Sequence, residues 1–281
     1  MCQELKEGDA VAFMSRHFVA LTCHYDLPKA DGTADSQVAV LSGFLLNLHN
    51  VFFWVTAGHC LKELEKLLSS ENVKVYGGGF MDYFGYGAVH KQTVPFRYEP
   101  GTGYYITRPE DGLDFGLIML NRLQVLAFEA NHLVAISRKN WERQSELTFD
   151  FYKMLGIPVD NVIRAGDGSD DVCVRPMMIH VNKINIDDLE DAPSDAEAPP
   201  TNAWFIGKIP AECTIKGLKG MSGGPIYGFR RDDQGHLTYH VVALQSRWWY
   251  KSRTVFGCSV PLFAEDTYQQ LGELIRGSKK R

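Results

Sequence analysis

The chain has 281 residues, and its content of 45% hydrophobic and 22% charged residues is typical of a folded globular protein and excludes an intrinsically disordered one. A formal net charge of −5 at pH 7 argues against nucleic acid or an anionic membrane as the partner. No apolar run reaches the roughly 20 residues that a membrane-spanning helix needs, and the acidic first residues do not match a secretory signal. We therefore expect a cytoplasmic protein.

Short runs of β-branched and aromatic residues, bounded by turn residues, recur along the chain. They occupy 38–48, 51–57, 73–76, 115–120, 177–181 and 240–244. Many short strands of this kind predict an all-β sandwich or barrel. Helical spacing occurs in 61–68, where leucines share one face, and in 263–275, which predicts a C-terminal helix.

One acidic segment, 187–200, differs from the rest of the chain. Its sequence, DDLEDAPSDAEAPP, is rich in Asp, Ala and Pro and poor in large apolar residues, which predicts a solvated surface loop inserted between strands. An acidic lid over a binding site is the alternative, and the sequence alone leaves it open.

The cysteines indicate neither a disulfide scaffold nor a metal site. There are six in a long chain, without a CxxC pair or a Cys/His cluster of metal-ligand spacing: Cys2, Cys23, Cys60, Cys173, Cys213 and Cys258. We expect free and mostly buried thiols, with no metal ion and no cofactor. His236 and His240 are spaced to share a strand face, but no third ligand accompanies them.

The strongest chemical signal surrounds Ser222, in the sequence GMSGGP at 220–225. A serine hydroxyl needs a base to take its proton and donors to hold the oxyanion that forms. Small flanking residues allow a tight turn, the approach of a carbonyl group, and free main-chain N–H groups. A glycine-rich turn with an incidental serine is the alternative for this motif taken alone.

A histidine and an aspartate upstream fit the same chemistry. His59 follows an apolar run in WVTAGHC at 54–60, and Asp114 lies at the start of another in LDFGLI at 113–118. Imidazole titrates near neutrality and can take the serine proton. A buried carboxylate needs a partner, which the second histidine nitrogen would supply. Asp111 is a competing candidate, and an ordinary turn aspartate is the alternative for Asp114 alone.

Together, TAGHC, LDFGLI and GMSGGP resemble the signature segments of the trypsin/chymotrypsin-like serine peptidases, in that family's order. The resemblance runs from about residue 10 to about residue 263. It implies an all-β fold of two antiparallel Greek-key β-barrels with a short C-terminal helix. The implied units are 10–125 with His59 and Asp114, 126–263 with Ser222, and 264–281 as a helix and basic tail.

The resemblance also implies an activity and the residues for it. The chain would be a serine endopeptidase acting on a protein or peptide through an acyl-enzyme, with Ser222 as nucleophile, His59 as general base and Asp114 orienting the histidine. The N–H groups of Gly220 and Ser222 would form the oxyanion hole.

Substrate-binding residues follow from the same comparison. Leu244, Gln245 and Ser246 would lie in the strand that pairs with the substrate, and Lys216 near the base of the specificity pocket. A lysine there would favour an acidic substrate side chain, but we favour a solvent-facing Lys216. We expect no trypsin-like preference for basic residues, because no aspartate occupies that position.

Two departures from the family pattern bear on regulation. Met221 stands where animal members place an aspartate that pairs with a newly cut N-terminus, so we infer no activation of that kind. Cys60 lacks the family's disulfide partner, since 43–45 reads GFL. The departures resemble the bacterial or intracellular branches and agree with a reducing compartment.

Two other functions fit parts of the sequence. A non-catalytic peptide-binding module could have the same fold. GMSGG also matches the GxSxG elbow of esterases and lipases, in which the aspartate and histidine follow the serine. The short remainder after Ser222 and the lack of alternating βα patterns disfavour that second alternative.

Overall fold

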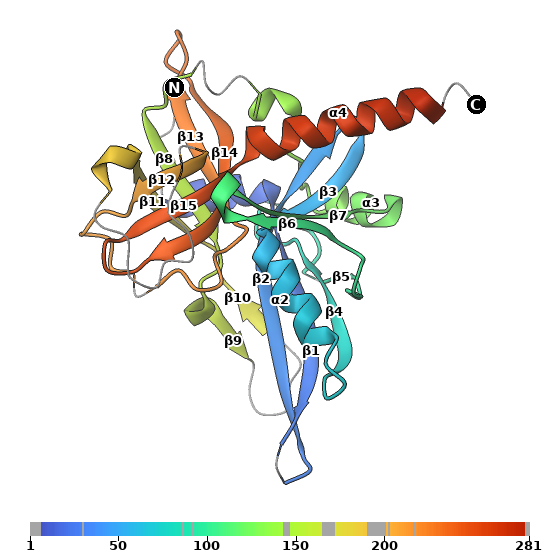
Figure 1. Cartoon of the computed structure of the whole chain (residues 1–281). Coiled ribbons are helices and arrows are strands. Elements are labelled where there is room, and N and C mark those ends of the chain that lie inside the picture. Colours follow the sequence, from blue (N-terminus) through green and yellow to red (C-terminus); the bar gives the residue numbers. More distant parts are fainter. Residues whose placement is uncertain are drawn as a thin grey trace.

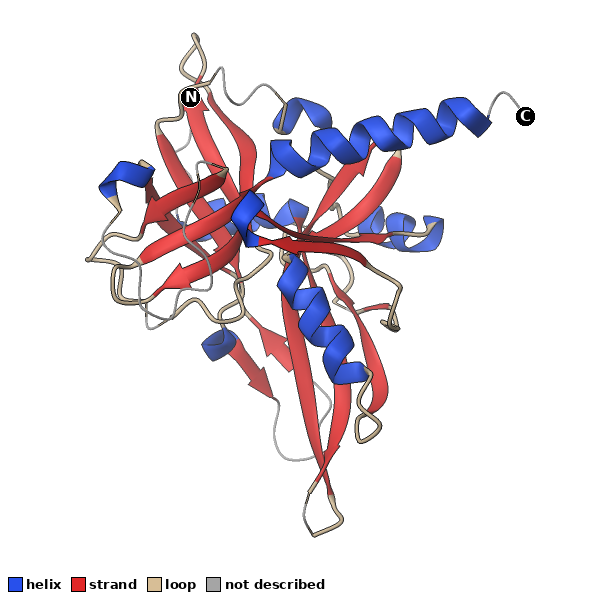
Figure 2. Ribbon diagram, in the orientation of Figure 1, coloured by secondary structure: helices blue, strands red, loops and turns tan. Residues whose placement is uncertain are grey.

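The computed structural model describes residues 7–29, 31–85, 87–91, 93–142, 147–164, 172–189, 201, 203–215 and 217–278. Lys216, Cys2 and most of the acidic segment 187–200 lie outside the described residues. Strands dominate the architecture, with helices at its edges (Figure 2). The prediction of an all-β fold is therefore confirmed.

The first unit is a seven-stranded antiparallel sheet, whose described hydrogen bonds leave β5 and β6 as its two edges. Its order is β5 (Val94–Pro95), β4 (Lys74–Met81), β1 (Phe18–Pro28), β2 (Ala34–Leu48), β3 (Val51–Thr56), β7 (Leu113–Met119) and β6 (Tyr104–Arg108). Strands β3 and β7 pair next to the edge strand β6, from Phe53 with Met119 to Thr56 with Gly116. The residues that follow β3 and open β7 are therefore neighbours in space.

The second unit is a closed six-stranded antiparallel barrel. Its order is β11 (Met177–Lys183), β12 (Trp204–Lys208), β15 (Thr254–Ser259), β14 (Leu237–Trp249), β13 (Pro225–Arg231) and β8 (Phe151–Gly156), and a small ladder joins β9 (Val162–Arg164) to β10 (Val172–Val174). The barrel and the sheet lie side by side in Figure 1. All pairs of named strands are antiparallel, which is incompatible with the α/β-hydrolase alternative.

The helices are short except for the last. They are α1 (Glu7–Met14), α2 (Gly58–Leu68), α3 (Arg122–Ala130) and α4 (Val260–Ser278), with single turns η1 (Ser15–His17), η2 (Pro109–Asp111), η3 (Arg138–Asn140), η5 (Val159–Asn161) and η6 (Ile186–Asp188). Helices α2 and α4 agree with the sequence, whereas α1 and α3 were not predicted. None of the described helices is both long and apolar enough to cross a membrane.

Three apolar clusters form the core. One lies within the first sheet around Trp54 and Phe80, and one within the barrel around Met154 and Ile226. The third contains residues of both units and extends to α4, where Phe115 and Phe263 stack with centroids 4.5 Å apart. This shared cluster packs the start of β7 against the beginning of α4. The predicted domain boundaries, at 125 and 263, remain a prediction.

Candidate active site

The contact between His59 and Asp114 organises the candidate site. β3 ends at Thr56, and α2 begins at Gly58, so His59 lies in the first turn of the helix. A side chain at position 58 would overlap the main-chain oxygen of Ile106 and lie 3.0 Å from Asp114 Oδ1. The glycine therefore lets α2 start directly against β6 and β7.

Asp114 holds the histidine at two points. The main-chain N–H of His59 donates to Asp114 Oδ1 over 2.8 Å, and His59 Nδ1 lies 2.7 Å from Asp114 Oδ2. The hydroxyl of Ser246 donates to the same Oδ2. The carboxylate is 4% exposed, and these donors compensate for its removal from water.

This coupling shifts the pKa of both partners. Burial lowers the pKa of His59, but the hydrogen bonds to Asp114 and Cys60 outweigh it and raise the pKa above the usual 6.5. Burial raises the pKa of Asp114, but the hydrogen bond from His59 outweighs it, and the net shift is downward. Asp114 is therefore an ionised carboxylate that favours the protonated form of His59.

The turn that carries Ser222 is held by main-chain bonds to β14. The N–H of Gly223 donates to Gln245 O over 2.7 Å, and the N–H of Gln245 donates to Gly224 O over 2.8 Å. Met221 points away from the site into the barrel core and is fully buried. Its buried side chain anchors the turn and leaves the neighbouring Ser222 half-buried at the surface.

Two glycines allow the turn to approach its surroundings closely. Gly220 and Gly223 have φ values of +91° and +89°, a region that glycine adopts without a steric cost. A Cβ at position 223 would overlap Thr56 Oγ1 and Ser42 O and lie 2.8 Å from Ala57 N. The serine turn thus packs directly on the strand end that precedes His59.

Ser42 joins the serine turn to the first sheet. Its hydroxyl is fully buried, donates to Gly220 O over 2.8 Å, and accepts from the N–H of Ile157 over 2.9 Å. Sequence reasoning missed this residue, since nothing near Ser42 in the chain distinguishes it from other strand serines.

A β-bulge in β14 places Ser246. The pairing of β14 with β15 shifts register between Gln245 and Arg247, so Ser246 has no partner in that ladder. Bulges of this kind redirect a side chain and leave backbone groups unpaired. Here the hydroxyl reaches Asp114, and the main-chain oxygen of Ser246 accepts from Ser222 Oγ over 3.4 Å.

Ser222 and His59 are neighbours that do not bond in this conformation. The described hydrogen bonds include none between Ser222 Oγ and His59 Nε2. Instead, the Cys60 thiol lies 3.6 Å from His59 Nε2 and 3.8 Å from Ser222 O. All five described cysteines are free, and Cys60 is one of three that are buried.

The other predicted residues lie in different surroundings. The N–H groups of Gly220 and Ser222 have no acceptor among the described hydrogen bonds. Leu244 is fully buried in the core, with neither its side chain nor its paired main chain in the site. Gln245 is buried, and its main chain holds the serine turn. Of the predicted substrate-binding residues, Ser246 alone reaches the cavity at the site; Lys216 is not described.

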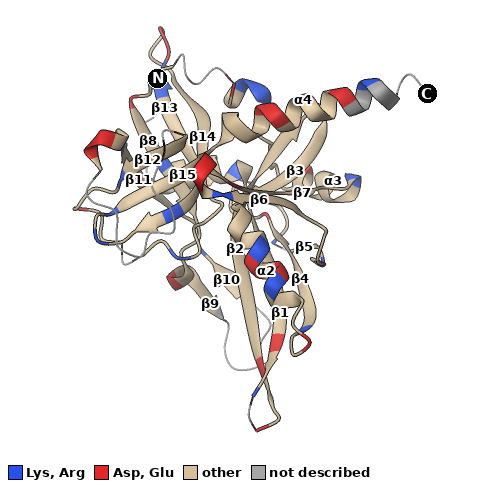
Figure 3. Cartoon of the chain, viewed as in Figure 1, with Lys and Arg blue, Asp and Glu red and all other residues tan. Residues whose placement is uncertain are grey.

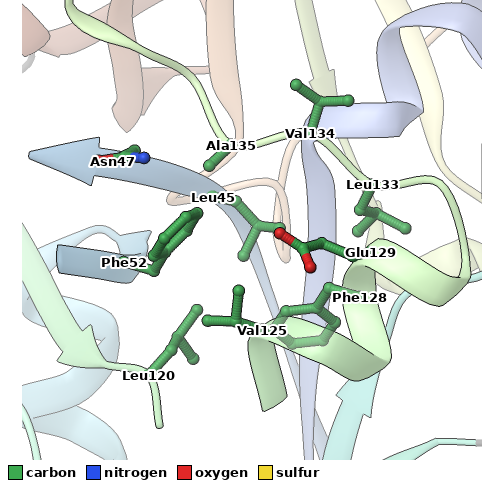
Figure 4. Close-up of a pocket in the computed structure, with 10 residues that line it drawn as sticks. All are labelled: Leu45, Asn47, Phe52, Leu120, Val125, Phe128, Glu129, Leu133, Val134 and Ala135. Atoms are coloured by element: carbon green, nitrogen blue, oxygen red, sulfur yellow. The ribbon is translucent and has the colours of Figure 1, made fainter. Parts of the chain in front are cut away.

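An open cavity of about 510 Å³ adjoins this cluster. It is lined by His59, Lys62, Glu63, Lys66, Thr107, Pro109, Asp114, Ser246 and Arg247. A second cavity, of about 290 Å³, lies between β2, β3 and α3, with Phe52, Val125 and Phe128 in its wall (Figure 4). It contains none of the candidate site residues. Among the described residues, no group of three or more His, Cys, Asp or Glu side chains could hold a metal ion.

Comparison with known proteins adds a limited similarity. No protein-family model and no curated protein matches the chain. It is similar to Glu endopeptidase in complex with MPD, with a TM-score of 0.45 and 12% identity over 89% of this chain and 90% of the other. It is also similar to a chain solved in work on the coupled folding and binding of the disordered Sesbania mosaic virus VPg protein. That match has a TM-score of 0.40 and 12% identity over 87% of this chain and 86% of the other.

Proposed function

We propose that this chain is a serine endopeptidase in which Ser222, His59 and Asp114 form the catalytic triad. The observation that carries the proposal is the pairing of a buried Asp114 with His59 Nδ1 over 2.7 Å, beside the glycine-rich turn of Ser222. An acceptor on Nδ1 fixes the tautomer with a free Nε2, which is the nitrogen that a general base needs.

The reaction begins with rotation of Ser222 Oγ from the oxygen of Ser246 toward His59 Nε2. Catalytic hydrogen bonds are often long before substrate binds. Ser222 Oγ then attacks the substrate carbonyl carbon while Nε2 takes its proton. The N–H groups of Gly220 and Ser222 stabilise the oxyanion. His59 returns the proton to the leaving amine, and water hydrolyses the acyl-enzyme by the same steps.

Asp114 and Ser246 support this cycle without touching the scissile bond. Asp114 stabilises the imidazolium that forms when His59 takes the serine proton. Ser246 donates to Asp114 and thereby holds the carboxylate in the plane that His59 needs. Both are positioning residues under this proposal, while Ser222 and His59 touch the reacting atoms.

A fluorophosphonate probe, which phosphonylates activated serines with loss of fluoride, tests the proposal. The wild-type protein should be labelled covalently with the probe, with the modification on Ser222 in a peptide map. Ser222→Ala should remain folded and unlabelled. A folded wild-type protein that is not labelled at neutral or alkaline pH would reject the peptidase.

A peptide-binding module without catalysis is the second candidate. The contact between Cys60 and His59 Nε2, together with the bond from Ser222 Oγ to Ser246 O, favours it, because both keep the serine and the histidine apart. A labelling failure accompanied by peptide binding would support this candidate.

A further inference from the structure

The cavity beside His59 carries an excess of positive charge on its walls. Two lysines from α2 and one arginine from β14 line it, with the carboxylates of Glu63 and Asp114. Asp114 is buried and engaged by His59 and Ser246. Glu63 is thus the one exposed carboxylate among the lining residues, against three cations.

Helix α2 places its two lysines on the face that begins with His59. Lys62 and Lys66 follow His59 by three and seven residues, a spacing that puts all three on one side of a helix. Both lysines are exposed and have no ion-pair partner among the described residues. In Figure 3, α2 carries both basic and acidic positions.

The two lysines repel each other along the helix. Like charges four residues apart destabilise a helix by about 0.2–0.5 kcal/mol. Lys62 and Lys66 have that spacing, while Glu63 three residues before Lys66 and the position of Lys66 in the last turn act in the opposite direction.

Arg247 supplies the third cation of the lining. It follows the bulged Ser246, and its guanidinium lies 5.7 Å from the centroid of the Trp204 ring. The acidic residues of nearby η2 do not line the cavity: Asp111 pairs with Arg108 over 3.3 Å, and Glu110 is exposed.

We propose that this cavity binds an acidic side chain, Asp or Glu, of the peptide substrate, through Lys62, Lys66 and Arg247. The inference rests on the proposed peptidase function. Because the cavity also contains His59 and Ser246, its occupant lies within a few residues of the scissile bond. An acidic residue is therefore preferred at one fixed position of the cleavage site.

A peptide library varied at every position tests the preference. The wild-type protein should enrich Asp and Glu at one position relative to the cleaved bond. The best substrate and its Glu→Gln counterpart are then compared by kcat/KM. Selectivity for Glu should fall by about fivefold to twentyfold in the double variant Lys62→Gln, Lys66→Gln, which is the size of two partly exposed ion pairs. It should also fall as the salt concentration rises.

Two further variants control for general effects. Glu63→Gln removes the exposed carboxylate from the same cavity, and the selectivity for Glu should rise. Lys139→Gln neutralises an exposed lysine of η3 that does not line this cavity, and both activity and selectivity should remain unchanged. Equal cleavage of the Glu and Gln peptides by the wild-type protein would overturn the inference and leave the peptidase intact.

A peptide-binding measurement distinguishes a failure of this inference from a failure of the proposed peptidase function. Fluorescein-labelled peptide pools with Glu or Gln at their central positions are titrated against Ser222→Ala. Ser222→Ala should bind the Glu pool more tightly than the Gln pool, and adding Lys62→Gln and Lys66→Gln to Ser222→Ala should abolish this difference. That result supports the acidic site even if no peptide is cleaved. Equal binding of the two pools, with no preference in cleavage, rejects it.

Discussion

Gly223→Ala should damage the site through geometry alone. At φ +89°, an alanine costs about 1–2 kcal/mol relative to glycine. Its Cβ would also overlap Ser42 O and Thr56 Oγ1, and overpacking of this kind costs about 1–3 kcal/mol. A total near 3 kcal/mol lowers Tm by roughly 6–12 °C for a protein of this size.

The same overlap should displace Ser222, the proposed nucleophile. Two of the three nearest atoms, Ser42 O and Ala57 N, belong to the main chain, so relief requires a shift of the serine turn by about 1 Å. Such a misplacement costs about 100-fold in rate. The fluorophosphonate labelling rate measures this loss, and differential scanning fluorimetry measures Tm.

Two variants make the test decisive. Gly217→Ala adds a Cβ with no atom within 4 Å and no left-handed φ, so Tm and labelling should stay near wild type. Adding Thr56→Ala to Gly223→Ala should not restore labelling, because the main-chain atoms remain. A wild-type Tm and labelling rate in Gly223→Ala, or full rescue by Thr56→Ala, would refute the reasoning.

Three further outcomes follow from the titratable groups. Asp114→Asn should lower kcat by about 10⁴-fold; an effect under tenfold would show that Asp114 does not orient His59. Since His59 must be neutral to accept a proton and its pKa is raised, the labelling rate should increase with pH, with a midpoint above 6.5. A midpoint below 6.5 would contradict that shift. Burial raises the pKa of Asp82 to about 6, so the stability that it contributes is present below pH 3.8 and lost as pH rises through 6. Asp82→Asn should remove this pH-dependent loss of stability. Plots of Tm against pH that run parallel for the variant and the wild type over pH 4–7 would contradict the raised pKa of Asp82.

The class of fold could be predicted, and the three side chains of the proposed triad could be singled out, because their signals are local. His59 and Asp114 lie at the boundaries of apolar runs, where β3 ends and β7 begins. Small residues around Ser222 mark a tight turn in any context. The capping box of α3, in which Asn121 and Gln124 exchange hydrogen bonds, was equally local. The sequence therefore contains a local signal for α3, although α3 was not predicted.

The supporting contacts of Ser246 and Ser42 could not be predicted from the sequence, because they depend on pairing between distant strands. The hydroxyl of Ser246 meets a carboxylate 132 residues away, and only the bulge in β14 sends it there. Ser42 meets Gly220 across 178 residues. No spacing rule in a single sequence relates such positions, since the register of a sheet is set by its whole hydrophobic pattern.

The contrast between local signals and long-range strand pairing explains why the predicted substrate-binding residues are the part of the site where sequence and structure differ most. Leu244 and Ser246 are two residues apart, and a regular strand would direct both side chains to one face. The register shift beside Ser246 breaks that alternation. Leu244 therefore packs in the core, while Ser246 lies at Asp114 and Arg247 borders the cavity. The bulge in β14 thus places both the Ser246 hydroxyl, which donates to Asp114, and Arg247, which lines the proposed acidic site. Removing the extra residue should therefore impair the orientation of His59 and the binding of an acidic side chain together.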